Sequence, residues 1–395
     1  MIKRQHYLNQ IIDLIDKNII KILTGVRRSG KSVLLQQVIN HLKNTGIKEE
    51  NIIFIDLESP DFFSYNTIAE LNEHIKSRSN KTDRFYLFFD EIQRIEGWQR
   101  LVNAYFSLDN FDVYVTGSNS KLLSGEFATY LTGRYVNIKV FPFSFSEYLE
   151  YNKDSKLSKK ELFMDYLRFG GIPSSFEFDN KTQYLNDLFD SVIFNDIIRR
   201  FEIKNVDLLI RLTHFLVSNI GQLVSANSIV KYLKKDRINV SVNTVYNYIS
   251  YLEEACLIYK VKREDLIGKK ILNHLEKYYL VDLGFREAIL KKDLDIGQSL
   301  ENLVYFELLR RGYEVNIGKY RNKEIDFICR KGSKKLYIQV TYLLASEDIH
   351  KREFDPLLKV KDNYPKYVLS LDEFDMSYMG VKHINIIEFL TSDEI

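Results

Sequence analysis

The stretch Lys21-Ile22-Leu23-Thr24-Gly25-Val26-Arg27-Arg28-Ser29-Gly30-Lys31-Ser32 decides the fold of the first part of the chain. A short apolar run comes first, the pattern Gly-x-x-x-x-Gly-Lys-Ser follows, and Val33-Leu34-Leu35 then opens a helical pattern. This is the strand–loop–helix setting in which a phosphate-binding loop works. Two glycines let the backbone fold into a nest of inward-pointing N–H groups, and the helix adds its positive end. The stretch therefore predicts a nucleoside triphosphate site that spans residues 25 to 32.

The last two residues of this loop have the side chains that ATP and its magnesium ion need. Lys31 is predicted to reach the β- and γ-phosphates, and the hydroxyl of Ser32 is predicted to ligate Mg²⁺. The alternative is a chance glycine-rich turn, but the strand before it and the helix after it argue against that. Arg27 and Arg28 are not required for cradling phosphate, so they face either solvent or a neighbour and the downstream domains.

A second element of an ATPase site follows further along the chain. Five apolar residues, Phe85-Tyr86-Leu87-Phe88-Phe89, end in the two acids Asp90 and Glu91. Asp90, at the carboxyl end of this strand, is predicted to hold the Mg²⁺ through water, and Glu91 is predicted to orient and polarise the attacking water. The alternative is that the two acids only cap the next helix.

Two later positions are candidates for contact with the γ-phosphate. The run Val113-Tyr114-Val115-Thr116-Gly117-Ser118-Asn119-Ser120 is a strand with a polar end, where Asn119 or Ser118 would sense the γ-phosphate or the attacking water; plain turn chemistry is the equal alternative. Arg134 precedes the next strand and would touch the γ-phosphate of its own or of a neighbouring subunit, unless it is an ordinary arginine at a strand start.

The spacing of apolar residues predicts an α/β fold for this region. Helical patterns cover 7–16, 33–45 and 67–79, and strands are predicted at 19–23, 51–56, 85–89, 113–117 and 135–140. Strands that alternate with helices indicate a parallel sheet with helices on both faces. Residues 141–201 are mostly helical, broken at Gly170-Gly171-Ile172-Pro173, and are predicted to form a small lid behind the nucleotide.

Composition limits the classes of protein to consider. With 395 residues, 45% hydrophobic and 28% charged, the chain is an ordinary soluble protein of two or three domains. A formal charge of +2 means that any nucleic-acid surface is a local patch. Cys256 and Cys329 lie in apolar contexts and are predicted to be buried, reduced thiols. No apolar run is long enough for a membrane span, and the start has no signal-peptide pattern, so we expect a cytoplasmic protein without a membrane partner.

The order of motifs resembles a known family. Gly25-Val-Arg-Arg-Ser-Gly-Lys-Ser, Phe89-Asp-Glu-Ile, Thr116-Gly-Ser-Asn-Ser, Leu131-Thr-Gly-Arg134 and Phe169-Gly-Gly-Ile-Pro173 resemble the AAA-type ATP-binding proteins of bacteria and archaea, often called archaeal-type ATPases. The resemblance runs over essentially the whole chain. It implies an AAA-like domain, a winged-helix-like segment after it, and a C-terminal domain of uncharacterised function that begins near Lys277-Tyr-Tyr-Leu-Val-Asp282-Leu-Gly284.

The middle of the chain predicts three helices and a hairpin. Helical segments at 207–218, 225–235 and 241–254 precede a strand at 257–263 and a turn at 268–270, the order of a winged helix. Asn243, Tyr246 and Asn247 form a polar stripe on the third helix, and residues 231–270 hold nine Lys and Arg against five Asp and Glu. This pattern predicts double-stranded DNA as a partner. The alternative is that the module packs against proteins or passes signals between domains.

The last part of the chain has the layout of a PD-(D/E)XK nuclease with altered residues. Glu301 lies on an amphipathic helix, Asp326 on a strand turn, and Gln339 with Thr341 on the next strand. Such nucleases need carboxylates for Mg²⁺ and a lysine near the attacked phosphate. Here the amide of Gln339 replaces the third carboxylate, and Thr341 replaces the lysine. Lys334, Lys335 or Lys361 would have to supply the missing positive charge. We therefore expect a domain that keeps the nuclease-like fold and binds DNA or a partner, in preference to an active nuclease.

These patterns predict three domains: an ATPase with its lid at 1–203, a winged-helix-like module at 204–272 and a nuclease-like domain at 273–395. The leading hypothesis is an ATP-hydrolysing protein that couples its nucleotide state to DNA binding. One alternative is a Mg²⁺-dependent nuclease gated by ATP. Another is a non-enzymatic nucleotide switch that binds protein partners, and a homo-oligomer is compatible with all three.

Overall fold

The first part of the chain forms a five-stranded parallel sheet in the order β2-β3-β4-β1-β5. Its strands are β1 Ile20–Thr24, β2 Ile52–Asp56, β3 Phe85–Asp90, β4 Phe111–Gly117 and β5 Tyr135–Lys139. Every residue of β1, β3 and β4 is buried, as is usual for the central strands of a parallel sheet, whereas the edge strand β2 is only partly buried. The prediction of an α/β fold with a parallel sheet is confirmed.

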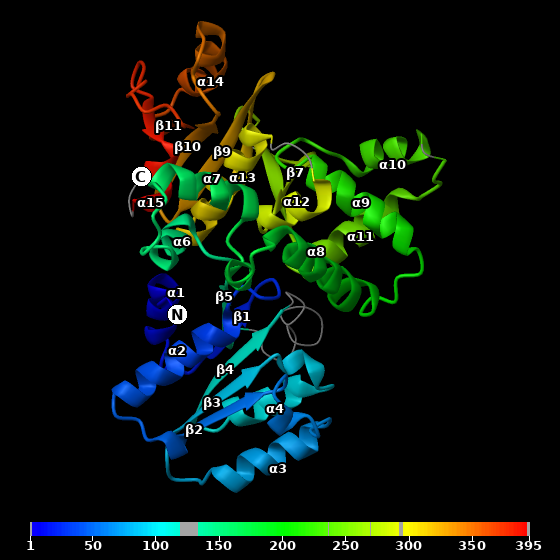
Figure 1. Cartoon of the computed structure of the whole chain (residues 1–395), viewed down its shortest axis with the longest axis vertical. Coiled ribbons are helices and arrows are strands. Elements are labelled where there is room, and N and C mark those ends of the chain that lie inside the picture. Colours follow the sequence, from blue (N-terminus) through cyan, green and yellow to red (C-terminus); the bar gives the residue numbers. More distant parts are fainter. Residues whose placement is uncertain (1, 119–132, 236, 269, 292–294, 393–395) are drawn as a thin grey trace. The chain divides into compact units, whose positions relative to one another are not determined.

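Helices cover both faces of this sheet (Figure 1). One face packs against α1 Gln5–Ile12 and α2 Lys31–Asn44, and the other packs against α3 Ile68–Arg78 and α4 Trp98–Phe106. Short 3-10 turns lie at Glu49–Asn51, Pro60–Phe62 and Ile92–Arg94. Because all five strands run the same way, their carboxyl ends share one edge, and ligands of open α/β sheets bind at that edge.

This computed structural model describes residues 2–118, 133–235, 237–268, 270–291 and 295–392. Two compact units divide the chain: the first holds Met1–Pro142 and Glu254–Cys256, and the second holds Phe143–Glu253 and Leu257–Ile395. Apart from Glu254–Cys256, the first unit thus ends at Pro142, whereas the sequence predicted an ATPase domain that continues to residue 203.

The helices predicted as a lid belong to the second unit because of where they pack. They are α6 Phe145–Tyr151, α7 Lys159–Phe169, α8 Lys181–Ser191 and a π-helix at Val192–Ile198, with a 3-10 turn at Pro173–Glu177. Both α7 and α8 pack on α12 Leu283–Leu290. The carboxylate of Asp282 accepts hydrogen bonds from the backbone N–H of Gly171 (2.7 Å) and of Gly284 (2.9 Å). Burial raises the pKa of Asp282 to about 7, against the opposing effect of these bonds.

A mixed seven-stranded sheet organises the second unit, in the order β12-β11-β10-β9-β8-β6-β7. Its strands are β6 Ile258–Asp265, β7 Lys270–Leu280, β8 Glu314–Tyr320, β9 Lys323–Lys331, β10 Lys334–Val340, β11 Lys366–Ser370 and β12 Lys382–Asn385. The remaining helices are α9 Val206–Ser218, α10 Ala226–Lys235, α11 Val242–Glu254, α13 Ile296–Arg310, α14 Glu347–Lys359 and α15 Ile386–Thr391.

The predicted boundary at residue 272 falls inside one of these strands. The three helices and the hairpin expected for a winged helix are present as elements, but the hairpin β6–β7 is the end of the large sheet, because β6 pairs in parallel with β8. Residues 204–272 therefore share a sheet with the predicted nuclease-like domain.

Two simpler expectations can be compared directly with the structure. Cys256 and Cys329 are buried free thiols, as predicted. Within the described ranges, no helix has the length and apolar character needed to cross a membrane.

Candidate functional site

The phosphate loop joins β1 to α2 at the carboxyl edge of the first sheet. Gly25 follows β1 with a φ of +157°, and a Cβ at this position would lie 2.1 Å from the carbonyl oxygen of Val140. Gly30 has a φ of +94° and caps the start of α2. Only glycine fits both positions without strain or collision. The backbone of the loop therefore requires glycine at both positions of the predicted motif.

Lys31 begins α2 and points back into the loop. Its ammonium donates to the carbonyl oxygens of Gly25 (3.0 Å) and Val26 (3.2 Å) and lies 3.7 Å from a carboxylate oxygen of Glu91. The residue is only 4% exposed. A buried cation at the head of a helix, beside a nest of backbone N–H groups, is suited to a polyphosphate.

Ser32 and Asp90 lie side by side, as predicted for a magnesium site. The hydroxyl of Ser32 and that of Thr116 both hydrogen bond to the carboxylate of Asp90. Burial raises the pKa of Asp90, and these two hydrogen bonds only partly oppose that rise. A hard cation takes hydroxyl and carboxylate oxygens as ligands, so Ser32 and Asp90 fit Mg²⁺. Thr116 was not predicted as a site residue, although it opens the Thr116-Gly-Ser-Asn-Ser motif at the end of a strand.

Glu91 is held in a strained backbone conformation next to this pair. Its φ is +53°, and its backbone N–H donates to the hydroxyl of Thr116 (3.0 Å). Its carboxylate accepts a hydrogen bond from Gln93 and interacts with Ser118. Burial alone would raise the pKa of Glu91, but the charge of Lys31 and these hydrogen bonds outweigh burial and hold the pKa below its ordinary value. Glu91 is therefore an ionised, oriented carboxylate, which is what a general base requires.

The two arginines inside the loop differ in their surroundings. Arg27 is half-buried, lies 3.7 Å from the carboxylate of Glu58 and helps to lower the pKa of Glu91. Glu58 also pairs with Arg94 at 2.6 Å. Arg28 is exposed and has a φ of +65°. Arg27 thus belongs to the surroundings of the site, whereas Arg28 faces solvent in this unit.

The predicted γ-phosphate contacts have different outcomes. Asn119 lies outside the described residues, while Ser118 is buried beside Gln93 and Glu91. Arg134 is exposed at the start of β5, where its carbonyl accepts from the N–H of Ile20 at the start of β1. Parallel strands place those starts at the sheet edge opposite the loop, so a contact from Arg134 to the phosphate of its own subunit does not fit. A contact to a neighbouring subunit stays a prediction.

Two of the three nuclease-like residues, Glu301 and Asp326, come together in the second unit around a lysine that the sequence did not single out as a site residue. The ammonium of Lys277, on β7, lies 2.8 Å from Glu301, 2.8 Å from Glu324 and 3.6 Å from Asp326. Lys277 is 3% exposed. Burial lowers the pKa of Lys277, but the three carboxylates outweigh burial and raise the pKa above its ordinary value. The positive charge beside Glu301 and Asp326 is therefore the ammonium of Lys277, a residue of the chain itself.

Gln339 is also engaged within the protein. Its amide oxygen accepts from the backbone N–H of Asp326 (2.8 Å), and its amide nitrogen donates to Glu353 (3.0 Å). Burial and the nearby charge of Glu301 raise the pKa of Asp326. Among the residues that the structure describes, no group of three or more His, Cys, Asp or Glu is arranged to hold a metal ion. The arrangement is a closed ion-pair cluster rather than an open metal site.

The predicted DNA-contacting residues lie on one exposed face. Asn243, Tyr246 and Asn247 are exposed on α11, while Val245, Tyr248, Ile249 and Leu252 bury its other face. The polar stripe predicted on this helix is therefore exposed, and its role in DNA binding stays a prediction.

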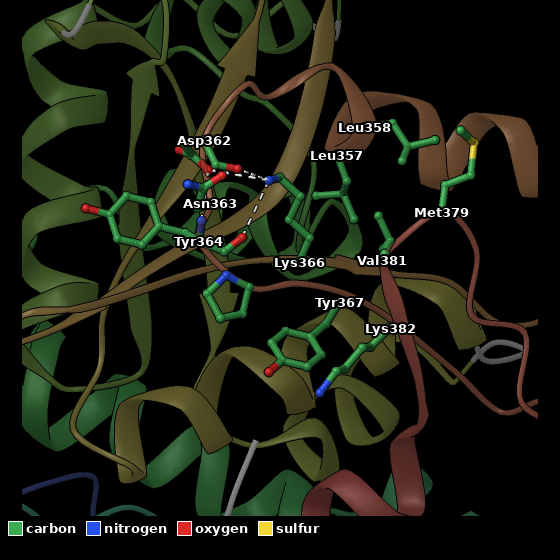
Figure 2. A pocket seen from close by; sticks show the side chains of 12 residues that line it. Leu357, Leu358, Asp362, Asn363, Tyr364, Lys366, Tyr367, Met379, Val381 and Lys382 are labelled. Atoms are coloured by element: carbon green, nitrogen blue, oxygen red, sulfur yellow. Dashed lines mark hydrogen bonds and ion pairs between the residues drawn. The ribbon is translucent and has the colours of Figure 1, made fainter.

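A cavity of about 410 Å³ lies between α14 and the segment that leads into β12. Its lining includes neither the phosphate-loop residues nor the ion pairs of Lys277. Figure 2 shows its lining, in which the ammonium of Lys366 hydrogen bonds to the carbonyl oxygens of Asp362 (2.7 Å) and Tyr364 (3.5 Å). Lys366 also forms an ion pair with the carboxylate of Asp362 (3.4 Å), so these two charged groups are partnered within the lining.

Residues 17–149 match the family described as an AAA domain. An uncharacterised protein of Haemophilus influenzae is 41% identical over 398 residues, which cover 99% of this chain and 98% of that protein. The chain belongs to the family of this protein. An uncharacterised protein of Methanocaldococcus jannaschii is 32% identical over 360 residues, covering 87% of this chain and 79% of that protein.

Among solved structures, a Walker-type ATPase of Pyrococcus abyssi has a TM-score of 0.52 at 16% identity, over 73% of this chain and 96% of that one. This likeness shows a shared fold, and the family match shows that residues 17–149 form an AAA domain. Residues 160–295 match a domain of unknown function (DUF8612). That match runs across both predicted boundaries, at 203 and 272.

Proposed function

We propose that the first unit binds ATP with Mg²⁺ and hydrolyses it. The observation that carries this proposal is the meeting of four predicted side chains at one sheet edge. Lys31 and Ser32 come from the start of α2, and Asp90 and Glu91 come from the end of β3. The buried hydroxyl of Ser29 adds support, because it has no hydrogen-bond partner among the described residues and lies in the loop that would receive phosphate.

The chain's own groups suggest how the site acts. Bound Mg²⁺ would neutralise phosphate charge between Ser32 and Asp90. Lys31 exchanges the carbonyl oxygens of Gly25 and Val26 for phosphate oxygens when ATP enters. This exchange weakens its ion pair with Glu91, whose carboxylate then accepts a hydrogen bond from the attacking water. Lys31 therefore links the binding of ATP to the freeing of the base.

Removal of the loop lysine tests the site directly. Lys31→Ala is expected to weaken ATP binding by about 10- to 100-fold, because a charge-assisted hydrogen bond to phosphate is lost. Lys43→Ala is the matched control, since Lys43 lies on the same helix but pairs with Glu49 at the surface. Titration with a fluorescent ATP analogue measures both. A wild-type protein that does not bind ATP, or equal affinity in both variants, contradicts the proposal.

A second proposed step is coupling of the nucleotide state to double-stranded DNA. The exposed amides of Asn243 and Asn247 support it, because such amides pair with adenine edges in the major groove. Asn243→Ala with Asn247→Ala is expected to weaken DNA binding about 10-fold or more. The control is Asn195→Ala, another exposed asparagine of the second unit. DNA affinity measured with ATP and with ADP decides the coupling: no binding in either state at low salt contradicts it.

The remaining alternatives have less support from the geometry. An ATP-gated nuclease needs an open metal site, and Lys277 already faces Glu301 and Asp326. A nucleotide switch that binds proteins would differ from the leading proposal by very slow ATP hydrolysis. A homo-oligomer controlled by the nucleotide would show an ATP-dependent change in the mass of the particle in solution.

A further inference from the structure

Arg4 lies outside every motif of the sequence, yet it is one of the most buried charged side chains in the first unit. It is 1% exposed and precedes α1. Its guanidinium donates to the carbonyl oxygens of Ser29 (2.8 Å) and Phe141 (2.9 Å). The first of these carbonyls belongs to the phosphate loop. A cation buried this deeply needs partners of this kind, and here the loop backbone provides one of them.

The contact with Ser29 fixes one peptide group of the loop. A trans peptide is planar, so the carbonyl of Ser29 and the N–H of Gly30 point in opposite directions. By holding that carbonyl, Arg4 sets the direction of the Gly30 N–H, one of the donors that a phosphate nest uses. The surrounding backbone needs such support, since Arg28 and Gly30 both have positive φ angles. Glycine allows several conformations at little cost, so this peptide can rotate if it is not held.

Arg4 is itself held firmly in place. Its guanidinium lies 4.5 Å from the ring centre of Tyr7, and the hydroxyl of Tyr7 accepts from the backbone N–H of Phe141 (3.1 Å). The backbone N–H of Arg4 donates to the side chain of Gln37 on α2 (3.1 Å). A side chain fixed from several directions can impose its geometry on a loop, whereas a flexible one cannot.

We propose that Arg4 is a positioning residue of the nucleotide site, which holds the Ser29–Gly30 peptide in the conformation that receives the phosphates of ATP. This inference rests on the proposed function. Arg4 contacts backbone carbonyls and not the reacting atoms, so its effect falls on binding. Loss of the guanidinium lets the peptide rotate, and the bound conformation must then be selected at each binding event.

The test uses the full chain with Arg4→Ala and Arg4→Lys, and Arg84→Ala as the matched control. Arg84 is half-exposed and pairs with Asp16 away from the loop. We expect Arg4→Ala to raise KM and Kd for ATP and ADP about 10-fold, with kcat and the affinity for adenosine unchanged. Arg4→Lys should fall between Arg4→Ala and the wild type. Added guanidinium ion should restore ATP affinity to Arg4→Ala, and Arg84→Ala should bind ATP as the wild type does.

The outcomes separate this inference from the proposed function. If the wild type does not bind ATP, the proposed function fails. If the wild type binds and Arg4→Ala binds equally well, this inference alone fails. A lower kcat with unchanged KM would mean a smaller folded fraction and overturns the positioning role. Fluorescence of Trp98, the single tryptophan, reports folding of the first unit; if Arg4→Ala unfolds, a folded Arg4→Lys with wild-type affinity also overturns the inference.

Discussion

Replacing Glu91 by glutamine is expected to lower kcat for ATP hydrolysis by about 10²- to 10⁴-fold while ATP still binds. The amide keeps the shape of the side chain but cannot accept a proton from water. It also loses the attraction to Lys31, 3.7 Å away, so Lys31 is freer to bind phosphate and the affinity for ATP should stay equal or rise. Phosphate release under steady-state conditions and a separate nucleotide titration measure the two effects.

The control for this variant is Glu58→Gln. Glu58 is a nearby carboxylate that pairs with Arg27 and Arg94, but its side chain is 46% exposed, so its removal should change kcat little. The pH profile gives a second check. Because burial raises the pKa of Asp90, whereas the pKa of Glu91 lies below its ordinary value in the free protein, kcat/KM should fall on the acid side as Asp90 is protonated, before Glu91 loses its charge. A Glu91→Gln protein that hydrolyses ATP at the wild-type rate would place the base elsewhere.

The ATPase site was predictable because its determinants are local. The spacing of Gly25, Gly30 and Lys31 defines a loop within eight residues, and a buried strand that ends in Asp90 and Glu91 defines the partner. Parallel strands then bring the two together at one edge without further information. This is why the predicted pairs of side chains meet in the structure.

Contacts that depend on strand order were not predictable in the same way. Thr116 reaches Asp90 because β4 lies beside β3, and no residue pattern encodes that neighbourhood. Arg134 was placed near the phosphate from its position before a strand, but the direction of β5 puts it at the other edge. Arg4 binds Phe141 across 137 residues, and a lone arginine before a short helix gives no signal of that.

Domain boundaries also depend on contacts between segments that are far apart in the sequence. Helices and strands of the second unit lie close to their predicted ranges, since their periodicity is local. The pairing of β6 with β8 joins Arg263 to Ile317, and this long-range pairing places the hairpin in the same sheet as the nuclease-like strands. The packing of α13 on this sheet brings Lys277 to Glu301 and Asp326, so the cation of the cluster could not be named from the sequence.

Replacing Lys277 by alanine is expected to destabilise the protein by about 3–5 kcal/mol, because it leaves buried carboxylates without their counter-charge. The side chains of Glu301 and Asp326 are only 13% and 12% exposed, and Glu301 has one further donor in the hydroxyl of Tyr279. The pKa of folded Lys277 lies above its unfolded value, so its contribution is fully present at neutral pH and is lost only as pH rises through the folded value. Urea unfolding followed by far-ultraviolet circular dichroism measures the loss, and the fluorescence of Trp98 shows whether the first unit stays intact.

The matched control is Lys260→Ala, because Lys260 lies on the neighbouring strand β6 with weaker, more exposed pairs at 3.7 and 4.0 Å. It should cost less than about 1 kcal/mol. Lys277→Met combined with Glu301→Gln should recover part of the stability, since it removes one of the stranded charges together with the cation. If Lys277→Ala unfolds at the wild-type midpoint, water must already reach the carboxylates well enough to solvate them. The cluster would then be open enough for a divalent cation. That result would favour the nuclease alternative, against which the buried Lys277 now argues.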